Sequence, residues 1–189
     1  MRVLVACEYS GVVREAFRAK GHEAISCDLL PTDKTGPHIQ GDCIPVIERN
    51  HFDLIIMHPP CTALAVSGNR WYGRGMPKHA ERLAAVEWTR ELWELAKRKA
   101  GAVAMENPVG VLPKMAGMEP AQYIQPWQFG HGETKNTGLW LHNLPKLKPT
   151  NIVDGRENRI HRLPPTEDRW KIRSTTFTGI AEAMAEQWG

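Results

Sequence analysis

The sequence predicts a single α/β domain with a doubly wound, mostly parallel sheet. Apolar runs that suit β-strands alternate with amphipathic helical patterns, and this order is typical of βαβ units. The runs at 52–57 and 101–105 are almost wholly apolar, as expected of strands buried on both faces. At 189 residues the chain is long enough to bury one sizeable core, so we assign 1–189 to one domain.

Each expected element rests on a local signal. The helix after the first strand stops at Gly21, because glycine favours helix C-termini. The longest expected helix has the clearest period, since Ala84, Trp88 and Leu92 recur at four-residue spacing. In chain order we expect strand 2–7, helix 12–19, strand 23–28, short helix 44–49, strand 52–57, helix 78–99, strand 101–105, strands 123–129 and 137–141, and helix 179–188.

The segments without a regular period are expected to be loops. A polar stretch containing Pro31 and Pro37 follows the second strand. Residues 62–77 are rich in glycine and small side chains, and we interpret them as a mobile loop at the active site. Residues 130–136 resemble a hairpin connection, and prolines keep 142–170 mostly extended or looped.

Positive charge is concentrated near the C-terminus. Eight basic and only four acidic side chains lie between 142 and 173, a net charge of +4 in a chain whose total is +3. This short basic, proline-rich segment suits contact with a phosphate-bearing partner. The alternative is a solvated basic surface with no partner.

No signal for export, membrane insertion or metal binding is evident. The apolar run at 2–7 is far shorter than a signal-peptide core, and no apolar segment reaches the length of a membrane span. Cys7, Cys27, Cys43 and Cys61 are widely spaced without a CxxC pair, which argues against a zinc site or a disulfide framework. We therefore expect free thiols, a cytoplasmic location and no metal.

Three histidines prompt a separate question about metal. The spacing of His58, His131 and His161 matches no zinc pattern, so hydrogen bonding to neighbouring groups is the expected role. The cluster of Trp88 and Trp93 is interpreted as core packing.

The first motif with chemical meaning is His58-Pro59-Pro60-Cys61, directly after the strand at 52–57. The two prolines restrict the backbone and set the direction of the thiol. A cysteine at such a turn, near the N-terminus of a following helix, has its pKa lowered from ~8.5 and becomes a nucleophile. The alternative is a small core residue. His58 is close enough in sequence to influence the protonation of Cys61.

The second motif is Glu106-Asn107-Pro108, after the strand at 101–105. Because adjacent parallel strands share one carboxyl edge, Glu106 is expected beside Cys61. Partial burial would raise the pKa of Glu106 and suit it to proton transfer near neutral pH. The alternative is a carboxylate that caps the next helix.

The order of these motifs resembles the DNA cytosine 5-methyltransferases, and the resemblance runs over most of the chain. Residues Gln125–His131 are also similar to small methylase-like proteins of bacteriophages and prophages. The resemblance implies a Rossmann-like fold of the S-adenosylmethionine-dependent methyltransferase type and methylation of carbon 5 of cytosine in DNA. It rests on Ser10-Gly11, Asp28, Asp42, Pro59-Pro60-Cys61, Glu106-Asn107, Phe129–Leu141 and Ser174–Gln187.

The resemblance also implies catalytic roles. The Cys61 thiolate would add to carbon 6 of the pyrimidine, and Glu106 would stabilise protonation at ring nitrogen 3. Asn107 would orient the loop of Cys61. Lys135, where the family carries an arginine, would contact the pyrimidine carbonyl or hold the same loop.

The implied cofactor is S-adenosylmethionine. Asp28 would bind the ribose hydroxyls and Asp42 the adenine amino group, while the turn from Glu8 to Gly11 would approach the methionine portion. This turn has one glycine where the family usually has several. The full set of implied cofactor-binding residues is Glu8, Tyr9, Ser10, Gly11, Asp28, Leu29, Asp42, Cys43 and Pro59.

DNA is the implied partner, although the large target-recognition region of the family is replaced by 142–173 alone. Arg159 and Arg162 in this segment are expected to contact phosphates. Arg70 and Trp71 would fill the gap left by a flipped base, with core stacking as the alternative for Trp71. Two other functions stay open: pyrimidine carbon-5 modification of a single strand or free nucleotide, and a non-catalytic relative that binds nucleic acid.

Overall fold

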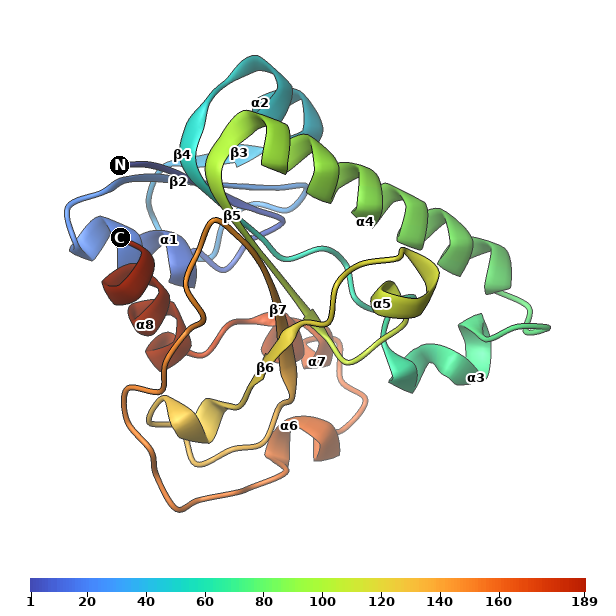
Figure 1. Cartoon of the computed structure of the whole chain (residues 1–189). Coiled ribbons are helices and arrows are strands. Elements are labelled where there is room, and N and C mark those ends of the chain that lie inside the picture. The colour runs from blue at the N-terminus through green and yellow to red at the C-terminus, as the bar shows by residue number, and fades with distance from the viewer.

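The computed structural model describes residues 1–189 as alternating strands and helices (Figure 1). The strands are β1 (Arg2–Ala6), β2 (Glu23–Asp28), β3 (His38–Gln40), β4 (Phe52–Met57), β5 (Ala100–Pro108), β6 (Gln122–Ile124) and β7 (Thr137–His142). The helices are α1 (Val12–Ala19), α2 (Cys43–Arg49), α3 (Asn69–Tyr72), α4 (His79–Lys99), α5 (Leu112–Met115), α6 (Arg159–Arg162), α7 (Arg169–Ser174) and α8 (Thr178–Trp188). There are also two 3-10 turns, η1 (Val66–Gly68) and η2 (Pro126–Gln128).

All seven strands form one sheet in the order β3-β2-β1-β4-β5-β7-β6. The pairs from β3 across to β5 are parallel, whereas β7 runs antiparallel to both β5 and β6. Strands β2 and β3 extend the sheet on one side of β1, and β4 and the later strands extend it on the other side. The sheet is therefore doubly wound. This arrangement confirms the fold class that the alternating pattern predicts.

Two hydrophobic clusters lie on the two faces of the sheet. Alternate side chains of β1 point to opposite faces, so Val3 and Val5 join one cluster and Leu4 and Ala6 join the other. Helices α1 and α8 cover the first face, and α2 and α4 cover the second, as Figure 1 shows. Burial of each such Val or Leu side chain stabilises the fold by roughly 1.5–3 kcal/mol. None of the helices combines the length and the apolar character needed to cross a membrane.

Strand β5 is longer than the sequence predicts. Its expected range ended at Met105, but antiparallel pairing with β7 continues until Pro108 lies opposite Thr137. Glu106 and Asn107 therefore lie inside the strand instead of after it. A partner strand from later in the chain extends β5, which local periodicity cannot reveal.

The prediction of a strand over 123–129 is wrong for the second half of that range. Strand β6 ends at Ile124, and the chain then forms η2. Pro126 lacks the N–H group that a ladder needs, and the side chains of Gln125 and Gln128 cap the 3-10 turn. The expected antiparallel pairing of this region with β7 is present through β6.

Several segments expected to be loops contain short elements. The edge strand β3 forms where the polar loop was expected, with His38 opposite Ser26. Residues 62–77 hold η1 and α3, and Arg82 of α4 donates hydrogen bonds to this segment at three points. The mobility of 62–77 stays a prediction. Segment 142–173 contains α6 and most of α7 between extended stretches.

Candidate active site

The carboxyl ends of β4 and β5 bring the two sequence motifs together. The strands are parallel neighbours, so Cys61 after β4 and Glu106 near the end of β5 lie at the same edge of the sheet. Asn107 is buried, and its side-chain Nδ2 donates a 2.9 Å hydrogen bond to the carbonyl oxygen of Pro59. This bond ties β5 to the turn that carries Cys61, the contact expected of Asn107.

The turn after Pro60 does not place Cys61 at a helix N-terminus. The backbone N–H groups of Leu64 and Ala65 donate to the carbonyl oxygen of Cys61 at 3.0 and 2.8 Å. The first helical residues after this turn are those of η1, a single 3-10 turn. The helix dipole expected to activate the thiol is therefore missing.

The pKa of the Cys61 thiol is raised, which contradicts the predicted lowering. Burial is the main cause, and the negative charge of Glu106 adds to it. The positive charges of Lys135 and Arg173 act in the opposite direction but do not outweigh these two effects. In the absence of substrate, Cys61 is therefore a protonated thiol at neutral pH.

The pKa of Glu106 is also shifted against the prediction. Burial raises this pKa, but the hydrogen bond with His58 and the positive charge of Lys135 together lower it below the ordinary value. The His58 Nδ1 atom lies 3.4 Å from Glu106 Oε2, and the two side chains are only 9% and 15% exposed. Glu106 is thus a carboxylate at neutral pH.

Lys135 reaches the site from a third segment, which leads into β7. It lies just before β7, which pairs with β5, and its backbone N–H donates to Gln125 Oε1 at 3.0 Å. Its charge acts on both Cys61 and Glu106, so all the catalytic residues expected from the sequence converge at this edge of the sheet. Their roles in catalysis stay predictions.

Beside this edge lies a cavity of about 340 Å³. The predicted cofactor-binding residues Asp28, Leu29, Asp42 and Cys43 all line it, since β2 ends and α2 begins there. The remaining lining residues are Cys7, Cys27, Gly41, Pro60 and Trp88. Pro59 is buried and does not line the cavity, because Pro60 occupies the lining position.

The carboxylates of the cavity keep acceptor capacity for a ligand. Asp28 Oδ1 accepts from the N–H of Leu30, and Asp42 Oδ1 accepts from the N–H of Ile44, each at 2.9 Å. The second oxygen of each carboxylate receives no hydrogen bond from the protein. Trp88 and the 73% exposed Leu29 add apolar surface. This set fits a ligand with hydroxyl and amino donors and a flat ring.

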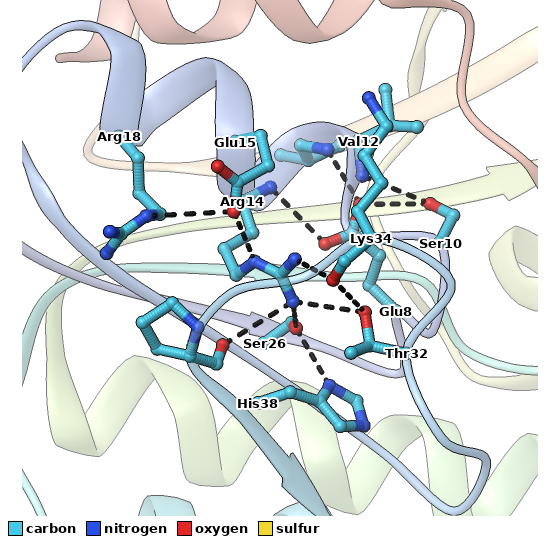
Figure 2. A network of polar contacts seen from close by, with 12 residues as sticks. Glu8, Ser10, Val12, Arg14, Glu15, Arg18, Ser26, Thr32, Lys34 and His38 are labelled. Carbon is cyan, nitrogen blue, oxygen red and sulfur yellow. Dashed lines mark hydrogen bonds and ion pairs between the residues drawn. The ribbon is translucent and has the colours of Figure 1, made fainter.

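The turn from Glu8 to Gly11 does not line the cavity, in contrast to its predicted position. The buried Glu8 carboxylate accepts from the backbone N–H groups of Val13 and Arg14, at 2.7 and 3.3 Å, and caps α1. Ser10 also donates to Glu8, as Figure 2 shows. The polar groups of this turn are therefore used within the protein.

Tyr9 from the same turn contacts the C-terminal part of the chain. Its hydroxyl donates a 3.0 Å hydrogen bond to the carbonyl oxygen of Lys171, and its ring lies 5.5 Å from that of Trp170. Tyr9 thus links the end of β1 to α7. A role in cofactor binding stays a prediction for Glu8, Tyr9, Ser10 and Gly11.

Arg14 of α1 holds the loop that follows β2 (Figure 2). Its fully buried guanidinium donates to Ser26 Oγ at 2.8 Å and to the carbonyl oxygen of Lys34 at 2.6 Å. Gly11, which has a left-handed φ of 69°, leaves room for this group, because a Cβ at this position would lie 2.5 Å from the guanidinium. The network thereby fixes the loop that carries Leu29.

Two of the three histidines, His58 and His131, act as hydrogen-bond partners, as predicted, whereas the hydrogen-bonding role of His161 stays a prediction. His131 Nε2 accepts from the backbone N–H of Gly179 at 3.0 Å, which fastens the 130–136 connection to α8. No group of three or more His, Cys, Asp or Glu side chains is arranged to hold a metal ion.

The residues expected to contact DNA lie outside the cavity. Trp71 is 54% exposed with Arg70 against its ring at 5.4 Å, so core stacking, the alternative for Trp71, is excluded. Arg159 and Arg162 line a second hollow of about 560 Å³ together with Arg156. Arg159 is paired with Glu133, and Arg156 lies 3.8 Å from the ring centre of Trp127.

Comparisons with known proteins identify the fold. No model of a protein family and no curated protein sequence matches the chain. Among solved structures, the Entamoeba histolytica methyltransferase EhMeth is similar at a TM-score of 0.51 and 12% sequence identity. The match covers 84% of this chain and 57% of EhMeth, so this chain spans little more than half of that protein.

The chain has a Rossmann-like methyltransferase fold. In such a fold, ligands bind at the carboxyl edge of the strands, where β1 and β4 diverge in chain order. The cavity and the motifs of Cys61 and Glu106 lie at this edge.

Sequence reasoning missed several residues of this edge. Trp88 packs against the core as expected, but it also lines the cavity, because the N-terminal half of α4 rises along the carboxyl edge. The helical period that identifies α4 carries no signal for this second role. His58 was expected to act on Cys61, whereas its hydrogen bond goes to Glu106. The positive charge of segment 142–173 is the one sequence signal that could have identified Arg156 as a candidate phosphate-contacting residue.

Proposed function

We propose that this protein is an S-adenosylmethionine-dependent methyltransferase that acts on carbon 5 of cytosine in DNA through a covalent Cys61 intermediate. One observation carries the proposal: a thiol, a carboxylate and a lysine from separate segments converge beside a cavity with free carboxylate oxygens. The methyltransferase fold supports the same assignment.

The cavity suits the adenosyl part of the cofactor. The free oxygen of Asp28 accepts from ribose hydroxyls, and that of Asp42 accepts from the adenine amino group. Leu29 and Trp88 pack against the adenine ring. When bound, S-adenosylmethionine supplies an activated methyl group.

Cys61 supplies the nucleophile for the pyrimidine. Carbon 5 of cytosine is a weak nucleophile, and addition of the Cys61 sulfur to carbon 6 makes it an enamine carbon that reacts readily. After methyl transfer, a base such as water takes the proton from carbon 5, the double bond between carbons 5 and 6 forms again, and the carbon–sulfur bond breaks to release the thiolate. Asn107 keeps the thiol in place through its bond to the Pro59 carbonyl oxygen.

Glu106 and Cys61 exchange a proton when the pyrimidine binds. The ring excludes water from Glu106, which raises the pKa of this carboxylate relative to the substrate-free protein. Glu106 then takes the thiol proton, so a thiolate and an acid that can protonate ring nitrogen 3 arise together. Lys135 stabilises the thiolate, because its charge lowers the pKa of Cys61.

The basic segment suits binding to the DNA backbone. Arg156, Arg159 and Arg162 line one hollow and can contact phosphate oxygens without reading sequence. Arg70 and the exposed Trp71 are available for the gap left by a flipped cytosine.

The test is methyl transfer from S-adenosylmethionine by the purified protein to duplex DNA, single-stranded DNA and deoxycytidine triphosphate, followed by nucleoside mass spectrometry. We expect 5-methylcytosine in DNA and none with Cys61→Ala, since Cys61 is the thiol that lies beside both Glu106 and Lys135. Product in the nucleotide alone would redirect the proposal to free nucleotides. Absence of any modified base, with the cofactor shown to bind by calorimetry, would overturn it.

A further inference from the structure

Three of the four cysteines converge on the cavity at the carboxyl edge. Cys7 follows β1, Cys27 lies in β2 and Cys43 begins α2, and all three line the cavity of about 340 Å³. Cys7 is half-buried and Cys43 is 4% exposed, whereas Cys27 is completely buried. Nothing in the proposed methylation uses these thiols.

Cys7 and Cys43 form a direct thiol pair. Their sulfur atoms lie 3.9 Å apart, although the residues are 36 positions apart in sequence. Cys7 has a left-handed φ of 57°, which is uncommon for a residue other than glycine. The N–H of Glu8 donates to the carbonyl oxygen of Cys27 at 3.2 Å and holds the backbone in this position.

The pair is electrostatically asymmetric. The hydrogen bond with Cys43 raises the pKa of Cys7, and burial adds to this effect. The same bond lowers the pKa of Cys43. Of the two thiols, Cys43 is therefore the one that ionises more readily, and the ionised sulfur is the more reactive nucleophile.

Cys27 differs from the other two thiols. Its Sγ donates to the carbonyl oxygen of Gly41 at 3.4 Å, and no other sulfur is its partner. Burial and nearby negative charges raise the pKa of Cys27 to about 12. It therefore stays a thiol at neutral pH and serves as an internal comparison.

We propose that Cys7 and Cys43 are an oxidisable dithiol that hydrogen peroxide or an alkyl hydroperoxide converts to a disulfide in the wall of the cavity. Cys43 gives its proton to solvent and its sulfur attacks a peroxide oxygen. The O–O bond breaks, the leaving oxygen takes up a proton, and the products are a sulfenic acid on Cys43 and water or an alcohol. The Cys7 sulfur then attacks the oxidised sulfur. The S–S bond forms, the S–O bond breaks, and water leaves. Two thiols are oxidised and one peroxide is reduced.

Formation of the bond requires the two sulfur atoms to move closer. A disulfide needs the sulfur atoms at ~2.05 Å, so they must approach by about 2 Å from their present separation. Because both residues line the cavity, the bond changes its wall, and a ligand that fills the cavity shields the pair from peroxide.

The experiment uses the full chain, reduced and desalted, then treated with hydrogen peroxide at neutral pH and with N-ethylmaleimide to block the remaining thiols. Non-reducing digestion and mass spectrometry are expected to find the Cys7–Cys43 cross-linked peptide as the main product, with Cys27 alkylated. The same treatment in denaturant should give mixed pairings, because unfolding separates the two native partners. Mixed pairings in the native protein as well would overturn the proposal.

Variants separate the two chemical steps. Cys7→Ser should leave Cys43 as a sulfenic acid that dimedone traps, whereas Cys43→Ser should abolish both disulfide and adduct. Cys27→Ser and Cys61→Ser serve as controls and should keep the Cys7–Cys43 bond. Dimedone capture on Cys27 instead of Cys43 would contradict the assignment. The disulfide requires neither S-adenosylmethionine nor DNA, so its outcome is independent of the methylation assay.

Discussion

Opposite charges flank the thiol of Cys61. Burial and the charge of Glu106 raise the pKa of Cys61, and Lys135 and Arg173 lower it, so the protonation state of this residue depends on burial and on a balance between charged neighbours. His58 contributes indirectly, because its hydrogen bond holds Glu106 as a carboxylate. The chemistry of the site is therefore set by pairs of residues rather than by the cysteine alone.

Changing either charged neighbour should move the thiol pKa in opposite directions. Glu106→Gln removes a negative charge and is expected to lower the pKa of Cys61, whereas Lys135→Ala removes a positive charge and should raise it. The measurement is the pH dependence of Cys61 alkylation by iodoacetamide, followed by peptide mass spectrometry. Glu186→Gln, whose partner is the distant Lys20, should have no effect. An unchanged or raised pKa in Glu106→Gln would contradict this account.

The same Glu106→Gln change should reduce turnover even though it activates the thiol. Loss of the acid at ring nitrogen 3 is expected to slow methylation by roughly 10²–10⁴-fold. Single-turnover assays with cytosine in DNA would measure the rate. Turnover equal to that of the wild type would show that Glu106 has no part in proton transfer.

The charge of Glu106 also makes stability depend on pH. Its pKa is lower in the folded than in the unfolded protein, so its stabilising contribution is present above the unfolded value of about 4.5. It is lost as pH falls through the folded value. Urea denaturation from neutral to acid pH should show the free energy of unfolding of the wild type falling more than that of Glu106→Gln. Parallel curves for the two proteins would exclude this contribution.

One buried guanidinium, that of Arg14, connects helix α1 to the loop after β2. Arg14 donates to groups on β2 and on the loop, and its side chain is completely buried. The loop carries Leu29 beside the cavity. An interaction in the core thus positions a loop at the edge that carries the candidate site (Figure 2).

Removal of this guanidinium should destabilise the protein and loosen the loop. Arg14→Met leaves several acceptors without donors, at a cost of about 3 kcal/mol in the free energy of unfolding. Urea denaturation measures this loss, and hydrogen exchange at Lys34 measures loop opening. Arg18→Met on the same helix, whose side chain is 40% exposed, is the matched control and should cost less than about 1 kcal/mol. Equal losses in the two variants would show that the network is not what holds the loop.

At the scale of the whole molecule, the two ends of the parallel strands differ. The candidate site lies at their carboxyl ends, and no part of it lies at their amino ends. The segment that lines the arginine hollow is held against residues 127–133, because Arg156 packs on Trp127 and Arg159 pairs with Glu133. Helix α4 ends at the opposite edge, where β5 begins. This polarity predicts which basic residues affect DNA binding.

Arginines of the hollow should contribute to DNA binding by neutralising phosphates. Arg162→Ala is expected to weaken duplex binding and to reduce the slope of log affinity against log salt by about 0.9 for each phosphate that is no longer neutralised. Fluorescence anisotropy over a range of salt concentrations measures both quantities. The control is Arg98→Ala at the exposed end of α4, which should leave the slope unchanged. Equal slopes for wild type and Arg162→Ala would remove this hollow from the DNA interface.

Sequence patterns alone predicted the fold class and the meeting of Cys61 with Glu106. Apolar runs identify buried strands, and parallel neighbours must place their carboxyl ends at one edge, so local signals suffice. The resemblance in motif order, rather than periodicity, predicted Asp28 and Asp42 as cofactor-binding residues. Both line the cavity, because Asp28 ends β2 and Asp42 caps α2.

Only the tertiary structure decided the charge state of Glu106, the role of the Glu8 carboxylate and the pairing of the thiols. The pKa of Glu106 depends on His58 and Lys135, which reach it from different segments. The turn at Glu8 was expected at the cofactor, but its carboxylate caps α1. The pairing of Cys7 with Cys43 is equally invisible in their spacing. Periodicity determines elements because it is local, whereas desolvation, charge and thiol pairing arise between residues that folding alone brings together.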